Sequence, residues 1–139
     1  MHLPNSKIEG LNLIENYISL EAEKTLLAQI DAQPWLLDLK RRVQHYGYKY
    51  DYRARRIDVS MKIGTLPNWM NELAIRLQQE SYFKSIPDQV IVNEYEIGQG
   101  ISPHIDCEPY FENTIAALSL NSTAVMNFTH TITEEKVSV

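Results

Sequence analysis

The sequence predicts an α+β fold in which N-terminal helices pack on an antiparallel, jelly-roll-like core. Helical periodicity is concentrated before residue 80, whereas alternating and β-branched residues dominate the second half. The chain has 139 residues, of which 44% are hydrophobic, enough for the core of one ordinary domain. It shows no repeat, low-complexity tract or linker, so we expect a single domain over residues 1–139.

A first helix is expected from Leu20 to about Gln33. Ser19 can cap its N-terminus, and two acidic residues, Glu21 and Glu23, lie in the first turn, where they favour the helix dipole. Pro34 forces the helix to stop. The side chains expected to face inward are Leu26, Leu27 and Ile30.

A second helix is expected after Pro67. Its apolar residues have the three-to-four spacing of a buried stripe, which indicates a helix that packs on a sheet. These residues are Trp69, Leu73 and Leu77, with Met70 and Ala74 beside them. We assign this helix a structural role.

The rest of the chain predicts strands. The candidates are Val43–Tyr52, Gln89–Tyr95, Ile101–Ile105, Thr114–Leu120, Thr123–Thr129 and Lys136–Val139. Gly98 and Gly100 supply the backbone freedom for a turn after the second strand. Asn121–Ser122 predicts a short hairpin connection between the fourth and the fifth.

The charge distribution excludes an all-over basic coat for nucleic acid, since the formal net charge is -5. Nevertheless, 7 of the 13 basic residues lie close together: Lys40, Arg41, Arg42, Lys49, Arg53, Arg55 and Arg56. This basic strip could bind a phosphate backbone, or it could be the solvated rim of a hairpin. The sequence leaves both interpretations open.

Cysteine usage and hydropathy indicate a cytoplasmic protein with no membrane partner. The one cysteine, Cys107, excludes an internal disulfide and fits a reducing compartment. No apolar run approaches the roughly 20 residues that cross a bilayer, and the N-terminus lacks the order of a secretory signal.

The most informative chemical motif is His104-Ile105-Asp106. On a strand, side chains two residues apart point to the same face, so His104 and Asp106 could bind one metal ion together. Non-haem iron oxygenases hold Fe(II) with two histidines and one carboxylate, which makes Fe(II) the expected metal. The alternative is a core histidine beside a turn aspartate.

Two further pairs of polar side chains are candidates for ligand contact. Asn93 and Tyr95 lie two apart on one predicted strand, and polar side chains that share an inward face need partners when buried. Tyr46 and Tyr48 belong to an alternating run with Tyr50 and Tyr52 beside the basic strip. An aromatic face of this kind suits a flipped base, or an ordinary half-buried strand.

The motif around these residues resembles the core of the AlkB family of iron- and 2-oxoglutarate-dependent dioxygenases. The resemblance covers residues 93–106, with the sequence NEYEIGQGISPHID. It extends to residues 42–48, RVQHYGY, which are similar to the strand of that family's substrate lid, and to the helical start from Gly10 to Ile30. Downstream, Phe111–Ile115 and Leu118–Leu120 also fit, so the similarity runs over most of the chain.

The resemblance implies a double-stranded β-helix and a role for each matching residue. His104 and Asp106 would be catalytic Fe(II) ligands, and Asn93 and Tyr95 would bind 2-oxoglutarate, the cosubstrate. Tyr46 and Tyr48 would contact the substrate. Glu108, two residues beyond Asp106, could line the pocket and accept a hydrogen bond from a substrate amino group or an arginine, or be a surface carboxylate.

The chain departs from the family pattern after this motif. The family has a second histidine and then arginines, one of which pairs with 2-oxoglutarate, but no arginine follows Arg76. His130 is the one later histidine, and it lies too early, at an expected strand end or turn. We therefore expect the last strands of the fold to be missing, which would expose a sheet edge to self-association.

Three hypotheses follow for function. The first is an AlkB-type dioxygenase that oxidises alkylated DNA or RNA, or modified tRNA, by hydroxylation or oxidative dealkylation, with a protein side chain as a further substrate class. The second is a catalytically inactive, truncated remnant that acts as a binding module. The third is a metal-free nucleic-acid binder that uses the basic strip.

Overall fold

The structure is a computed structural model that describes residues 2–4, 8–49, 61–105 and 114–139. The chain divides into two compact units. One comprises Gln33–Ala116, and the other comprises Met1–Ala32 together with Ala117–Val139. The expectation of a single domain over residues 1–139 stays a prediction.

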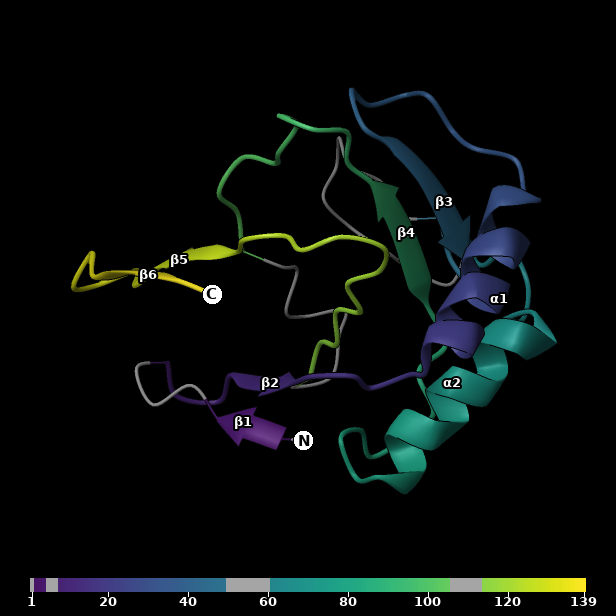
Figure 1. Ribbon diagram of the computed structural model, residues 1–139, viewed down its shortest axis with the longest axis horizontal. Helices are drawn as coiled ribbons and strands as arrows, with labels where there is room; N and C mark the ends of the chain where they lie inside the picture. Colours follow the sequence, from purple (N-terminus) through teal and green to yellow (C-terminus); the bar gives the residue numbers. More distant parts are fainter. Residues whose placement is uncertain (1, 5–7, 50–60, 106–113) are drawn as a thin grey trace. The chain divides into compact units, whose positions relative to one another are not determined.

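The first of these units is built on an antiparallel strand pair, β3 (Arg42–Tyr46) and β4 (Val90–Glu94) (Figure 1). The register pairs Val43 with Asn93 and Tyr46 with Val90. Because directly opposed residues share a face of the sheet and faces alternate along a strand, Asn93 and Tyr46 lie on opposite faces. This register positions the candidate site.

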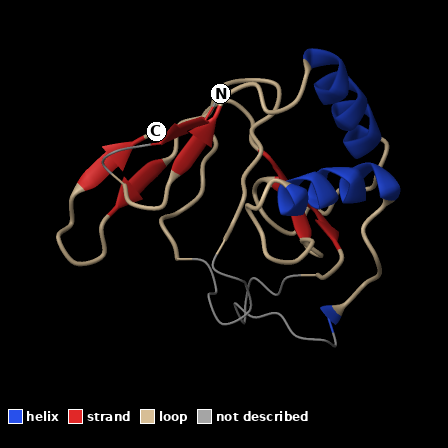
Figure 2. Cartoon of the chain, turned by 90° about the horizontal axis from the view of Figure 1, so that it is seen from below, coloured by secondary structure: helices blue, strands red, loops and turns tan. Residues whose placement is uncertain are grey.

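Helix α2 (Asn68–Gln79) begins after Pro67, as predicted, and packs on the β3–β4 pair (Figure 2). The core cluster consists of Leu66, Met70 and Ala74, with Tyr46, Trp69, Val90 and Val92 packed against it. Met70 and Ala74 are the buried residues of the helix, and Trp69 is only partly buried. The centre of the apolar stripe is therefore shifted by one residue from the predicted line.

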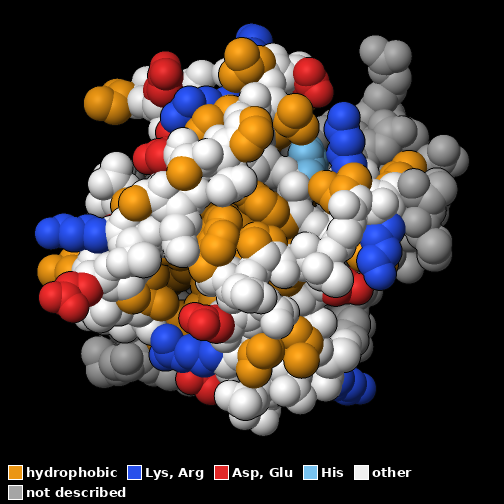
Figure 3. Space-filling view, turned by 90° about the vertical axis from the view of Figure 1, so that its right-hand side faces the viewer, with side chains coloured by type: hydrophobic (Ala, Val, Ile, Leu, Met, Phe, Trp, Pro, Cys, Tyr) orange, Lys and Arg blue, Asp and Glu red, His pale blue; other side chains and the backbone are white. Residues whose placement is uncertain are grey.

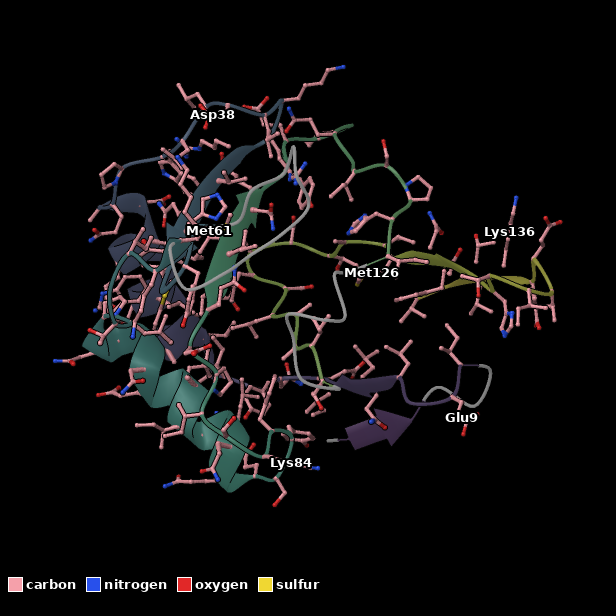
Figure 4. The ribbon with its side chains drawn as sticks, turned by 180° about the vertical axis from the view of Figure 1, so that it is seen from behind. Glu9, Asp38, Met61, Lys84, Met126 and Lys136 are labelled. Atoms are coloured by element: carbon pink, nitrogen blue, oxygen red, sulfur yellow. The ribbon has the colours of Figure 1, made fainter. Side chains whose placement is uncertain are left out.

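Strand β3 ends earlier than the predicted Val43–Tyr52. Gly47 has φ +80°, which takes the backbone out of the extended region. A Cβ at Gly47 would lie 1.9 Å from the carbonyl oxygen of Asp88. Beyond this point, Lys49 N donates to the carbonyl oxygen of Met61 at 3.0 Å, and Figure 4 labels Met61. A left-handed glycine against a neighbouring backbone thus interrupts the predicted run.

The other unit contains helix α1 (Leu20–Asp31) and two strands that were not predicted, β1 (His2–Pro4) and β2 (Asn12–Ile14). The predicted cap of α1 is confirmed, since Ser19 Oγ accepts a hydrogen bond from Ala22 N at 3.1 Å. The helix stops at Asp31, before Pro34. Of its predicted inward residues, Ile30 is buried, and Leu26 and Leu27 are partly buried.

This unit also holds a hairpin of β5 (Asn127–Thr129) and β6 (Lys136–Ser138), drawn in yellow in Figure 1. The prediction that His130 lies at a strand end or turn is confirmed. Its Nδ1 accepts hydrogen bonds from Ile132 N and Thr133 N, both at 3.1 Å. This ring nitrogen therefore stabilises the turn of the hairpin.

Two predicted strands are wrong. Ile101–Ile105 and Thr114–Leu120 form no strand, and most of their large apolar side chains, such as Ile105 at 60% and Ile115 at 58%, are exposed. Thr123–Thr129 is reduced to β5, so Asn121–Ser122 does not connect two strands, although Asn121 does adopt φ 73°. Alternation alone does not make a strand, because a strand needs a partner to bond its backbone groups.

The described residues thus combine two helices with three two-stranded antiparallel sheets. This mixed architecture confirms the α+β class. Its small antiparallel sheets are compatible with the oxygenase fold that the sequence implied. Within the described ranges, neither helix has the length and apolar character required to span a membrane.

Candidate functional site

The candidate cosubstrate residues Asn93 and Tyr95 lie at the C-terminal end of β4. Asn93 is in the strand and is exposed, and Tyr95 follows its last residue and is 44% exposed. The register places Asn93 on the face opposite the one that α2 covers. The two side chains are therefore accessible, and the expected burial of this pair is not observed.

The Asn93 amide is oriented by an arginine. Arg41 Nε donates to Asn93 Oδ1 at 2.8 Å, between segments 52 residues apart in the sequence. A guanidinium has no acceptor, so the oxygen of the amide must face it, and the amide nitrogen is left as a donor. A carboxylate can accept hydrogen bonds from the amide nitrogen of Asn93 and from the phenol hydroxyl of Tyr95.

His104 lies in an exposed segment without regular secondary structure. Its Nδ1 is 2.9 Å from the carbonyl oxygen of Ser102, which can only accept, so Nδ1 carries the proton. The Nε2 of a neutral ring then carries the lone pair that a metal ion requires. Histidine ligands in metalloproteins usually donate their other nitrogen to a carbonyl or carboxylate in this way.

The other predicted metal and pocket residues, Asp106 and Glu108, lie outside the described residues. In the part of the chain that the structure does describe, no three His, Cys, Asp or Glu side chains form a group that could hold a metal ion. His130 belongs to the unit that does not contain His104. Because Asp106 lies outside the described residues, its pairing with His104 stays a prediction.

Tyr46 has a packing environment. Its ring makes an edge-on contact with Trp69, with centroids 5.8 Å apart and an interplanar angle of 79°. Its hydroxyl donates to Oε1 of the buried Gln44 at 2.6 Å, and Gln44 in turn donates to the carbonyl of Gln33. Burial raises the pKa of Tyr46. These contacts are typical of a packed residue in a half-buried strand, and they lie on the face opposite Asn93.

Tyr48 follows the break at Gly47 and is partly buried, with its backbone paired to Lys62 in an isolated bridge. The structure therefore does not place Tyr46 and Tyr48 on one regular strand. The other two members of the predicted run, Tyr50 and Tyr52, lie outside the described residues. The substrate role of Tyr46 and Tyr48 stays a prediction.

The basic strip is partly neutralised by residues that are distant in the sequence. Arg42 forms two bonds to Glu94, Nε to Oε1 at 2.6 Å and Nη2 to Oε2 at 2.9 Å, and lies 4.2 Å over the Trp35 ring. Arg41 is bonded to Asn93, so two cations of the basic strip form hydrogen bonds with residues of β4. Figure 3 likewise shows Lys and Arg scattered among acidic and apolar side chains on the face drawn.

Two titratable groups beside the site are shifted. The hydrogen bond from Arg42 lowers the pKa of Glu94, with burial opposing and the charge of Arg42 assisting. Burial, and then the charge of Lys49, lowers the pKa of His45, against the opposing effect of Asp38 in the loop before β3 (Figure 4). His45 shares its face with Asn93, so the ring beside the candidate site favours the neutral form.

Sequence reasoning missed Arg41 as a partner of the candidate site and assigned it only to the basic strip. The signal was present in the strand pattern, because pairing Val43 with Asn93 places residue 41 diagonally opposite residue 93. The described residues fit the expected groups as far as they extend. His104 offers one imidazole nitrogen for iron, and Asn93 and Tyr95 offer donors for a dicarboxylate.

Comparison with known proteins gives an independent finding. The profile of the 2OG-Fe(II) oxygenase superfamily matches residues 10–138. A protein from Arabidopsis thaliana, "Alkylated DNA repair protein ALKBH8 homolog", is 39% identical over 126 residues, which are 87% of this chain and 36% of that protein. No solved structure gives a significant match.

Two further relatives carry different names. The Xenopus tropicalis "tRNA (carboxymethyluridine(34)-5-O)-methyltransferase alkbh8" is 38% identical over 126 residues, which are 87% of this chain and 20% of that protein. The human "Alpha-ketoglutarate-dependent dioxygenase alkB homolog 4" is 29% identical over 122 residues, 85% of this chain and 40% of that protein. The chain thus spans well under half the length of each of these three relatives.

Proposed function

Because this chain belongs to the AlkB-like family of the 2OG-Fe(II) oxygenase superfamily, we propose that it acts in iron- and 2-oxoglutarate-dependent oxidation of alkylated nucleic acid. The reaction would hydroxylate a methyl or similar carbon on a base. Where the hydroxylated carbon is bonded to nitrogen, the C–N bond would then break, the carbon would leave as an aldehyde and the nitrogen would regain a proton. A modified tRNA or alkylated DNA is the substrate class that we favour.

The observation that carries this proposal is the geometry of His104. The Nδ1 contact with the Ser102 carbonyl favours the tautomer in which Nε2 carries the lone pair, which is the form of the ring that binds a metal. His104 is also exposed, so a metal could reach it without rearrangement of a core.

Each residue of the site would have a distinct task. His104 would give an imidazole nitrogen, and Asp106 a carboxylate oxygen, to iron, a donor mixture that Fe(II) accepts. Asn93 and Tyr95 would donate to the carboxylates of 2-oxoglutarate and fix its position. When bound, the metal and 2-oxoglutarate would activate O2, converting the cosubstrate to succinate and CO2 as the substrate is hydroxylated.

The names of the relatives support the substrate class. One is named for alkylated DNA repair and another for a modified uridine of tRNA. The basic residues Lys40 and Lys49 are on the same unit as Asn93 and could meet phosphates. We further propose that the protein has a jelly-roll core and, from the single cysteine of this chain, a cytoplasmic location.

The test is turnover of 2-oxoglutarate. The protein is loaded with Fe(II) without oxygen and then mixed with 2-oxoglutarate, O2 and an alkylated oligonucleotide or tRNA, and succinate and the modified base are measured. We expect succinate release by the unaltered protein and its loss in His104→Ala and Asp106→Ala. Arg76→Ala, an exposed change on α2, is the control and should retain activity.

The alternative is a binding module without catalysis. It is favoured by the sequence of residues 77–139, which contains no arginine and in which His130 is the one histidine after His104. A folded protein that binds neither Fe(II) nor 2-oxoglutarate and releases no succinate would establish this alternative and overturn the enzyme. Nucleic-acid binding that resists a chelator and falls steeply with salt would then assign the chain to the basic-strip mechanism.

A further inference from the structure

We infer that Arg41 is a positioning residue that holds the Asn93 side chain in the orientation required to bind 2-oxoglutarate. This inference rests on the proposed function, because it assigns Asn93 to the cosubstrate. It adds a residue outside the 93–106 motif, and the argument for it is the contact between two segments of the sheet.

The first step is the direction of the Asn93 amide. Arg41 Nε donates to Oδ1 at 2.8 Å, so the amide cannot rotate by half a turn without placing its own donors against a cation. In the observed orientation the Nδ2 donors are directed away from Arg41. A carboxylate only accepts, and a rotated amide would present an oxygen to it instead.

The second step is that the backbone around Arg41 is itself fixed. Gln99 Nε2 donates to the Lys40 carbonyl at 3.3 Å, and Gln99 Oε1 accepts from Glu96 N at 2.8 Å. On the other side, Arg42 is bonded twice to Glu94. Lys40–Arg42 is thus tied at three points to the segment that carries Asn93 and Tyr95, so less order must be created when the cosubstrate binds.

The third step is accessibility. Asn93 is exposed on the face opposite α2, and Arg41 is only partly buried. The arginine therefore orients the amide and leaves it exposed. A dicarboxylate can reach the amide donors without contacting Arg41, so the effect of Arg41 is transmitted through Asn93.

The experiment measures binding of 2-oxoglutarate to the whole protein, with and without Arg41→Met. We expect the dissociation constant to rise about threefold to tenfold, the range of one net hydrogen bond, while kcat at saturating 2-oxoglutarate stays unchanged. Arg76→Met is the matched control, because Arg76 Nε also bonds to an exposed side chain, Glu80, at 3.0 Å. It should bind as the unaltered protein does.

A double variant separates positioning from a general structural effect. If Arg41 acts through Asn93, then Arg41→Met should weaken binding no further once Asn93→Ala is in place. An additive loss would contradict the inference. A second readout needs no variant of Arg41: 2-oxoglutarate should shift the NMR signals of the Asn93 Nδ2 protons in the unaltered protein, and their constancy would overturn it.

Failure of the inference and failure of the proposed function are distinguishable. An unaltered protein that binds no 2-oxoglutarate overturns both. An unaltered protein that binds and turns over 2-oxoglutarate, with Arg41→Met identical to it, overturns only the role of Arg41. Equal weakening in Arg41→Met and Arg76→Met would likewise overturn that role.

Discussion

Arg42 and Glu94 face each other across β3 and β4, with two parallel hydrogen bonds of 2.6 and 2.9 Å between guanidinium and carboxylate. The Arg42 guanidinium also lies 4.2 Å from the centroid of the Trp35 ring. This pair links the basic strip to the strand that carries Asn93. It therefore connects the stability of the sheet to the geometry of the candidate site.

The pair predicts a pH-dependent contribution to stability. Because its pKa in the folded state lies below the ordinary value of 4.5, Glu94 contributes fully above that value. The contribution is lost as the pH falls through the folded-state pKa. Both side chains are more than a third exposed, so Glu94→Gln should cost only about 0.5–1 kcal/mol near neutral pH.

Urea unfolding of the unaltered protein and of Glu94→Gln, at neutral and at acidic pH, checks this. The gap in the free energy of unfolding should close on acidification. Glu80→Gln, which breaks the exposed Arg76–Glu80 pair within α2, is the control and should cost less near neutral pH. A gap that stays constant across the pH range would contradict the prediction.

Gly47→Ala should destabilise the protein. Alanine in the left-handed region costs about 1–2 kcal/mol, and its Cβ would also meet the Asp88 carbonyl oxygen at 1.9 Å. The oxygen belongs to the backbone and cannot rotate away as the end of a flexible side chain could, so the loss should exceed the conformational cost alone. Gly10→Ala has nearly the same φ, +82°, but nothing within 4 Å of the added Cβ, and should cost less. Equal midpoints of urea unfolding for the two variants would refute the contact.

Tyr46→Phe separates packing from substrate contact. Removing the hydroxyl leaves Oε1 of the buried Gln44 without this donor, which should cost about 1–3 kcal/mol. A residue that served only the substrate would instead change KM and leave stability unaltered. Thermal unfolding and steady-state kinetics of the same preparation decide between the two. We expect the melting temperature to fall and KM to change little.

The helices could be predicted from the sequence because their signals are local. Ser19 as a cap, Pro34 as a stop and Pro67 as a start each act within one turn of the chain, and the observed boundaries agree with them to within a few residues. The apolar spacing of α2 likewise predicted its packing on a sheet. Local stereochemistry is enough for such elements.

The strands could be predicted only where a partner exists. Gln89–Tyr95 became β4 because β3 pairs with it, whereas Ile101–Ile105 has similar alternation but forms no ladder. Strand β3 was predicted too long, since the conformation of Gly47 depends on the Asp88 carbonyl, 41 residues away in the sequence. A short stretch of sequence around Gly47 cannot reveal a contact with a residue so distant in the chain.

The candidate site likewise has a part that the sequence predicted and a part that it could not predict. The residue types at Asn93, Tyr95 and His104 indicated the chemistry, since the motif is local. The Arg41–Asn93 bond and the placement of Tyr46 on the opposite face depend on the strand register and required the structure.

The most direct test of the account is metal binding by His104. Mn(II), a spectroscopic substitute for Fe(II), is titrated into the unaltered protein and into His104→Ala, and the bound ion is counted by electron paramagnetic resonance. We expect one site whose affinity falls by at least about tenfold in His104→Ala. His130→Ala should bind Mn(II) as the unaltered protein does. Equal Mn(II) affinity in His104→Ala and the unaltered protein would contradict the central claim.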